Sequence, residues 1–191
     1  GGSVTGNTVT LHSGSAVYNL YGGWAEDAGS APGNIVIVHT GAVVEGNVYG
    51  GILGSASGIT ADNNTVTLHS GVAVGNDVYG GNKLSILAIG AGNRLVLIGA
   101  GQSVGGNLKG FQTLDFSLPA ATAGGSTVLT VAGEADITGV TVALGFEAAP
   151  SLNGGSKITL IDAGAGTLTG VPANSTVSAS GYTFRIEVED S

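Results

Sequence analysis

The stretch NTVTLHSGVAVGNDVYGG, at Asn64–Gly81, is the third copy of a repeat motif that decides the fold of this chain. The two earlier copies are NTVTLHSGSAVYNLYGG at Asn7–Gly23 and NIVIVHTGAVVEGNVYGG at Asn34–Gly51, and a diverged fourth copy, NRLVLIGAGQSVGGNLKGF, covers Asn93–Phe111. The leading Asn residues are 27, 30 and 29 positions apart. A repeat period of this size predicts an architecture in which successive copies stack on one another.

The pattern within each copy predicts strands. In the first copy Val9 and Leu11 fall on one face, whereas Thr8, Thr10 and His12 fall on the other. Glycine then ends the segment, and two more short apolar segments precede Tyr-Gly-Gly. Three short strands per copy predict one coil of an all-β, right-handed parallel β-helix, in which each repeated position forms a column with a spacing of about 4.8 Å.

Stacking of this kind explains the residue types of the repeat. Inward Val and Leu columns form an apolar core that one coil could not bury alone, and each side chain contributes about 1.5–3 kcal/mol on burial. The Asn that begins each copy is suited to a ladder of side-chain amide hydrogen bonds. Glycine supplies the positive φ that sharp corners need.

The pattern also divides the chain into two parts. We expect about four β-helix coils in residues 1–108, and a C-terminal capping segment in residues 109–191, where the repeat fades but strand-like alternation continues. Because the end of a stacked sheet exposes strand edges, a cap of different composition that continues the helix irregularly is expected there. The stretches that follow each Tyr-Gly-Gly are expected to be projecting loops, at Trp24–Gly33, Ile52–Asn63 and Asn82–Gly92.

Composition narrows the class of protein. The 191 residues include 36 Gly, 42% hydrophobic and 9% charged residues, which disfavours both a helical and a disordered chain. Five Lys and Arg against 13 Asp and Glu leave no basic stripe, so we expect no nucleic-acid partner. No apolar run is long enough for a membrane helix, and the lack of Cys removes disulfides and thiolate metal sites. The chain opens inside Gly-rich repeats, so we expect a piece of a longer protein.

Two enzyme motifs occur in VLIGAGQSVGG (Val96–Gly106), and neither is complete. Gly99 and Gly101 fit a dinucleotide-binding fingerprint, but Val104 stands where its third Gly belongs and no helix-forming stretch follows. Ser103 lies in a G-x-S-x-G pattern, but the His of such a hydrolase follows its Ser, and every His of this chain precedes it. We therefore expect no catalytic residue and no bound cofactor.

The acidic residues are scattered along the chain, at Glu26, Asp27, Glu45, Asp62, Asp77, Asp115, Glu134 and Asp136. Polysaccharide-cleaving β-helices carry paired carboxylates or calcium-binding Asp clusters on one face. Asp62 is nearest to a cluster, beside Asn63 and Asn64, but no acid recurs one coil away. A polysaccharide-processing enzyme therefore stays an alternative, which mutation of Asp62 or Asp77 would test.

His12, His39 and His69 occupy one repeat position and should form an outward column. A metal site or a pH sensor is one interpretation. Adjacent imidazoles on a flat face should converge poorly on one ion, so we favour simple inheritance by repetition and expect no metal. Two imidazolium ions about 5 Å apart repel by about 1 kcal/mol in water, so the column should resist full protonation.

Tyr21, Tyr49 and Tyr79 also share a repeat position and should form a second column, which is either an aromatic strip for sugar binding or a structural stack. Trp24, the single Trp, follows the first Tyr-Gly-Gly. It is either an exposed contact or a staple for the loop that follows. We regard these four residues as the possible ligand contacts of the chain.

Beyond these physical arguments, the NTVTLHSG…NVYGG phrases resemble the passenger regions of bacterial autotransporters, which use the type V secretion route. GFQTLDFSLP (Gly110–Pro119), TVLTVAGEADITGVTVAL (Thr127–Leu144) and SKITLIDAGAG (Ser156–Gly166) are similar to the segment before the translocator barrel. The resemblance implies a secreted or outer-membrane-anchored β-helix at the cell surface, whose C-terminal part nucleates folding. It implies an adhesin, often a virulence factor, whose partners are its own translocator and host-cell or extracellular glycans or proteins. Self-association in biofilms is the alternative that this resemblance leaves open.

Overall fold

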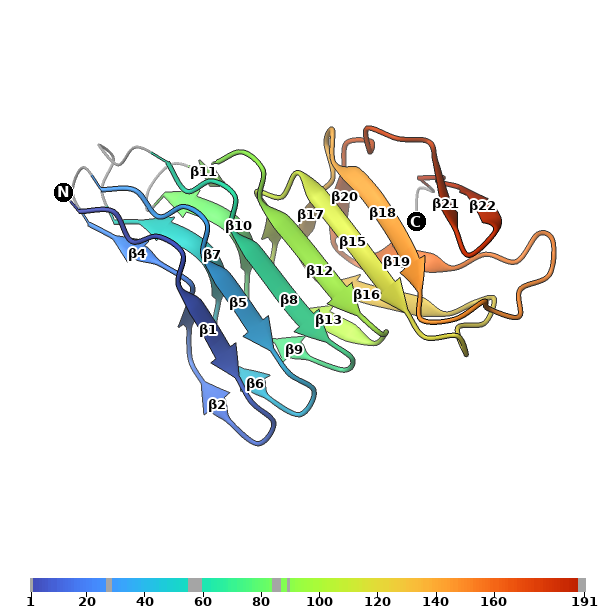
Figure 1. Cartoon of the computed structure of the whole chain (residues 1–191), viewed down its shortest axis with the longest axis horizontal. Helices are drawn as coiled ribbons and strands as arrows, with labels where there is room; N and C mark the ends of the chain where they lie inside the picture. Colours follow the sequence, from blue (N-terminus) through green and yellow to red (C-terminus); the bar gives the residue numbers. More distant parts are fainter. Residues whose placement is uncertain (1, 27–28, 55–59, 84–86, 89, 189–191) are drawn as a thin grey trace.

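The computed structural model describes residues 2–26, 29–54, 60–83, 87–88 and 90–188. The chain is all-β, and parallel strands stack into the predicted β-helix. Figure 1 shows the coils following one another from the N-terminal to the C-terminal end of an elongated molecule. Among the described residues there is no helix that could cross a membrane.

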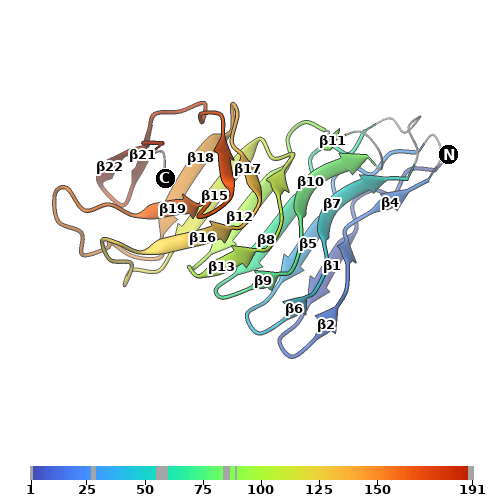
Figure 2. The ribbon, with the colours of Figure 1, turned by 180° about the vertical axis from the view of Figure 1, so that it is seen from behind.

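Each coil gives one strand to each of three sheets. Sheet A, in front in Figure 1, contains β1 (Thr8–Leu11), β5 (Ile35–Val38), β8 (Thr65–His69), β12 (Arg94–Ile98), β15 (Thr113–Leu118) and β18 (Thr141–Phe146). Sheet B, seen from behind in Figure 2, contains β2 (Ala16–Val17), β6 (Val43–Val44), β9 (Ala73–Val74), β13 (Gln102–Val104), β16 (Thr127–Val131) and β19 (Thr159–Asp162). Sheet C contains β3 (Leu20–Tyr21), β7 (Val48–Leu53), β10 (Val78–Lys83), β14 (Leu108–Lys109), β17 (Glu134–Asp136) and β20 (Thr167–Thr169).

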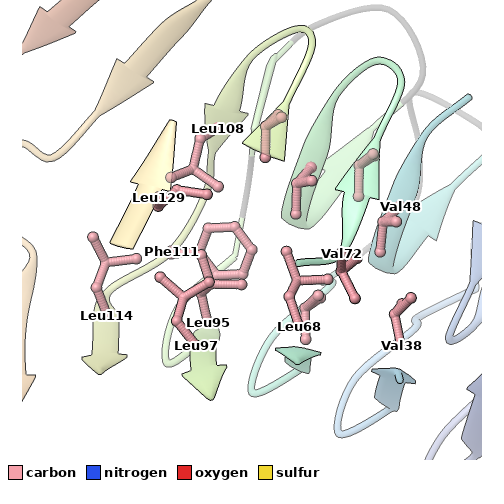
Figure 3. Packing of buried hydrophobic residues seen from close by; sticks show 14 of the residues in the cluster. Val38, Val48, Leu68, Val72, Leu95, Leu97, Leu108, Phe111, Leu114 and Leu129 are labelled. Atoms are coloured by element: carbon pink, nitrogen blue, oxygen red, sulfur yellow. The ribbon is translucent and has the colours of Figure 1, made fainter. Parts of the chain in front are cut away.

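The register places equivalent residues of successive copies directly beside one another. In sheet A, Val9 pairs with Val36, Val36 with Val66, and Val66 with Leu95. Val36, Val66 and Leu95 are fully buried, whereas Val9, in the first coil, is half-buried. The predicted inward columns are therefore confirmed, and Figure 3 shows them meeting side chains of sheets B and C in one continuous core.

A buried asparagine ladder runs along the solenoid, as the repeated Asn predicts. The backbone N–H of Asn34 donates to Oδ1 of Asn64 (2.8 Å), and that of Asn64 donates to Oδ1 of Asn93 (2.8 Å). At the next coil, Oε1 of Gln112 accepts the hydrogen bond from the Asn93 N–H (2.8 Å). Asn34, Asn64 and Asn93 have no exposed surface, so the ladder satisfies backbone groups that water does not reach.

The stretches after Tyr-Gly-Gly begin as strands rather than as the projecting loops that we expected. Trp24 and Ala25 form β4, which pairs in register with Ile52 and Leu53 of β7, and β7 pairs with the end of β10. The strand β11 (Leu87–Ala88) folds back on β10 in antiparallel orientation. Within these stretches, residues 27–28, 55–59, 84–86 and 89 lie outside the described chain, and they include Asp27.

A second small core explains this extension of sheet C. Ala25, Ala31, Leu53 and Ala61 are buried together, with Val4 packed against them. Burial of these apolar side chains against one another stabilises the paired strands β4 and β7, which favours continued pairing over an open loop.

The segment from residue 109 onward first adds further strands to all three sheets, from β15 to β20, before it leaves the helix. The last two described strands, β21 (Thr176–Ala179) and β22 (Tyr182–Arg185), form an antiparallel hairpin near the C-terminus (Figure 1). Asn174 docks this region on the edge strand β18, because its Oδ1 accepts from the Val142 N–H (2.8 Å) and its Nδ2 donates to the Val142 carbonyl (2.9 Å). Phe184 packs against Phe146, with ring centres 5.7 Å apart.

Candidate functional site

The aromatic column lies on the outer side of sheet C. Tyr21, Tyr49 and Tyr79 pair in register on β3, β7 and β10, and the residue before each of them points into the core. The ring centres of Tyr21 and Tyr49 are 5.3 Å apart at 2°, and those of Tyr49 and Tyr79 are 5.6 Å apart at 9°. The structure therefore brings the three predicted tyrosines into one parallel stack.

Two glycines after each tyrosine hold this corner of the coil close to its neighbours. A Cβ on Gly22 would lie 2.3 Å from the carbonyl oxygen of Gly50, and one on Gly50 would lie 2.4 Å from that of Gly80. A Cβ on Gly23 would lie 2.5 Å from Nδ2 of Asn34, in the asparagine ladder. Tyr-Gly-Gly is thus a packing requirement of the corner, and it fixes the tyrosines in register.

Asp77 makes the far end of the column acidic. It belongs to a second hydrogen-bond ladder, which joins Asn47, Asp77 and Asn107 on successive coils. The Asp77 N–H donates to Oδ1 of Asn47 (3.0 Å), and Oδ1 of Asp77 accepts from the N–H of Asn107 (2.7 Å). Its other oxygen accepts a long hydrogen bond from the Tyr79 hydroxyl (3.4 Å). Burial, reinforced by Asp77, raises the pKa of Tyr79 to about 12. Burial also raises the pKa of Tyr49, so both phenols stay protonated donors at neutral pH.

The stack limits what the tyrosines can bind. Tyr49 lies between two parallel rings, so it presents its edge and hydroxyl, not its face, to solvent. Trp24 is different, because its ring is tilted by 54° from Tyr21, with centres 5.1 Å apart, and 42% of its surface is exposed. Of the four predicted contact residues, Trp24 offers the flat aromatic surface that stacking on a sugar ring requires.

Besides Trp24, the first two coils expose apolar side chains that sequence reasoning did not name as contacts. Tyr18 is 66% exposed at the turn between β2 and β3, and Ile35 and Val43 face outward from the second coil. The sequence did contain a sign that Tyr18 is unusual. In the first copy Tyr18 alone occupies the turn before the recurring Asn position, where later copies have two residues, such as Glu45 and Gly46. A shortened turn that carries a large side chain marks a departure from the repeat.

The two partial enzyme motifs lie in regular strands of the β-helix and the turn between them. Ser103 is in β13 of sheet B, paired with Ala73 and Thr130, whereas the three histidines lie at or just after the ends of strands of sheet A. The chain from Val96 to Gly106 forms β12, a turn and β13, with no helix. The structure does not bring Ser103 and a histidine together on one sheet.

Several acidic residues make structural contacts. Asp115 pairs with Arg94, and Glu134 pairs with Lys109 and accepts a hydrogen bond from the Thr169 hydroxyl. The hydrogen bond from Lys109 lowers the pKa of Glu134. Oδ1 of Asp62 accepts the N–H of Ala91 (2.8 Å). Within the described chain, no three His, Cys, Asp or Glu side chains gather where they could hold a metal ion.

The histidine column also forms as predicted. The rings of His12 and His39 are 5.3 Å apart at 5°, and those of His39 and His69 are 4.5 Å apart at 33°. Burial, and then the charge of His39, lowers the pKa of His69. This direction agrees with the expectation that the column resists protonation.

A pH dependence of stability follows. Because the folded state binds the His69 proton more weakly than the unfolded state, stability should fall as pH drops below the ordinary histidine pKa, about 6.5. The effect should stay below about 1 kcal/mol, since the ring is largely solvated and salt screens it. Thermal melts between pH 7.5 and 5 should show a flatter pH dependence for His69→Gln than for the wild type. Equal slopes would contradict this assignment.

Comparison with known proteins identified no relative, because no family model, curated protein or solved structure matches this chain.

Proposed function

We propose that this chain is a non-enzymatic adhesive module of a secreted or surface-anchored protein, of the autotransporter passenger type that its repeats resemble. In this proposal the β-helix is a rigid spacer, and the C-terminal segment covers its end and nucleates folding. The docking of Asn174 on the edge strand β18 supports the capping part of the proposal.

The observation that carries the adhesive role is the aromatic surface at Trp24. Trp24 and Tyr21 together form a tilted aromatic pair at the N-terminal end of the column. The hydroxyls of the tyrosine column and the carboxylate of Asp77 lie further along the same sheet. A flat apolar ring at one end of a row of tyrosine hydroxyls, with a carboxylate at the other end, matches the chemistry of a glycan, which presents C–H faces and hydroxyls together.

Binding of the purified chain to a glycan array and to cultured host cells tests this role. Trp24→Ala should weaken binding about tenfold, the value of one aromatic contact of about 1.4 kcal/mol. The matched control is Val171→Ala, which removes an exposed apolar side chain near the C-terminal end. Equal binding by both variants would exclude the Trp24 surface as the contact.

Self-association is a second candidate, and one observation favours it. The outward positions of β1, β5 and β8 carry Thr, Ile and His and no Asp, Glu, Lys or Arg, in a chain with net charge −8. Ile35 on this face is 38% exposed. Two copies could meet there without opposing like charges. Sedimentation velocity at several concentrations separates this candidate from a monomeric adhesin.

A further inference from the structure

The structure adds ring positions and spacings to the histidine column that the sequence predicted. His69 ends β8, and His12 and His39 directly follow β1 and β5, so three imidazoles from successive coils share one outer edge of sheet A. Backbone pairing fixes this alignment, because the N–H of His39 donates to the carbonyl of Leu11 (3.0 Å). Ile98 occupies the next coil and ends the column.

The ring spacings are those of imidazoles that share a metal ion. With metal–nitrogen bonds of about 2.0–2.1 Å and a ligand angle of about 90° to 110°, two such rings have centres about 4.5–5.2 Å apart. The observed spacings are 4.5 Å for His39 and His69 and 5.3 Å for His12 and His39. We expected adjacent imidazoles to converge poorly, but the backbone already holds them at the required separation. What remains is a turn of each ring about its Cβ–Cγ bond.

The pair His39 and His69 fits best. Its rings are closer and already tilted by 33°, whereas His12 and His39 are nearly parallel at 5°. The nitrogen lone pairs of an imidazole lie in its ring plane, so two nearly parallel rings need a larger turn before both can face one ion. The nearest ionised groups on sheet A, Arg94 and Asp115, pair with each other on the following coils.

We propose that His39 and His69 form a two-imidazole binding site for a divalent first-row transition metal ion such as Cu²⁺, Ni²⁺ or Zn²⁺. Neutral imidazole suits these ions, and water completes their coordination. Metal binding requires the neutral imidazole, which predominates above the ordinary histidine pKa of about 6.5. Because His39 belongs to both pairs, the column binds one ion per chain.

Such an ion would join the second coil to the third. It would bind the folded chain and not the unfolded one, so it would stabilise the β-helix. At free metal about one hundred times the dissociation constant, the melting temperature should rise by about 5–10 °C.

Calorimetric titration of the full chain with NiCl₂ at pH 7.5 tests the site. The wild type should bind one equivalent, and His12→Gln should bind within about twofold of it. His39→Gln and His69→Gln should each bind at least tenfold more weakly and lose the metal-dependent rise in melting temperature. At pH 5.5 the wild type should also bind at least tenfold more weakly.

Melts without metal show whether each variant folds, and either His39→Gln or His69→Gln alone decides the question. Wild-type affinity in either variant would overturn the site, and so would equal loss in His12→Gln. Half an equivalent of metal with a doubled sedimenting mass would place the ion between two copies and would overturn the site within one chain. These outcomes are independent of glycan binding at Trp24.

Discussion

Replacing Gly50 by alanine should destabilise the chain by about 3 kcal/mol or more, a large share of the roughly 5–15 kcal/mol that stabilises a typical domain. The added Cβ would lie 2.4 Å from the carbonyl oxygen of Gly80 and 2.8 Å from Cβ of Asn64. Neither atom is the far end of a flexible side chain. Relief of the overlap therefore requires two coils to separate, and their separation would break the pairing of β7 with β10 and the asparagine ladder beside it.

Urea denaturation of the purified variant measures this loss, with Gly145→Ala as the matched control. Gly145 also lies within a parallel strand, β18, but a Cβ there would meet nothing within 4 Å. The control should change the free energy of unfolding by less than about 1 kcal/mol. Similar losses in the two variants would mean that strand propensity, rather than the close approach of coils, explains the glycine.

The contrast between these glycines shows how far the sequence predicts this fold. Periodicity predicted the coils and their inward columns, because one pattern of burial recurs at every level of the stack. It also predicted glycines at corners, and Gly14, Gly41 and Gly71 do have φ of 79°, 79° and 69°. The first glycine of Tyr-Gly-Gly has another cause, the carbonyl of the next coil, and a single copy of the repeat contains no sign of it.

Where the copies differ, the sequence predicted less. The extension of sheet C depends on Ala25, Leu53 and Ala61, which lie in stretches of different length and share no phrase. The ion pair of Lys109 with Glu134 depends on the path of the chain beyond the last recognisable repeat, which no sequence period indicates. The second ladder was visible as a recurring Asn19, Asn47 and Asn107, but Asp77 interrupts it, and only the structure shows why an acid is accepted there.

Asn64→Asp should be nearly as damaging as Gly50→Ala. Asn64 is fully buried; its Oδ1 accepts from the N–H (2.8 Å) and Nδ2 (3.2 Å) of Asn34, and its own Nδ2 donates to Oδ1 of Asn93 (3.3 Å). A carboxylate can accept but not donate, so one charged oxygen would face the Asn93 oxygen away from water. We expect a loss of about 3 kcal/mol or more at pH 7.

The sign of its pH dependence is opposite to that of His69. Burial without a donor should raise the pKa of the new carboxyl above its unfolded value, so the variant should regain stability as pH falls from 7 towards 4, when the neutral acid again donates to Asn93. Urea denaturation at pH 7 and pH 5 measures this recovery relative to the wild type. A pH-independent loss would show that shape, not charge, causes the damage.

The reciprocal variant, Asp77→Asn, tests the same physics from the other side. At this position the acid already accepts the N–H and Nδ2 of Asn107, at 2.7 and 3.0 Å, and its second oxygen faces the Tyr79 hydroxyl. An amide keeps the acceptor and gains a donor towards Asn47, so the change should stay within about 1 kcal/mol. Exchange of amide and acid should therefore be costly at Asn64 and nearly neutral at Asp77. At Asp77 the Tyr79 hydroxyl donates to the second carboxylate oxygen, whereas at Asn64 that oxygen would face the acceptor oxygen of Asn93.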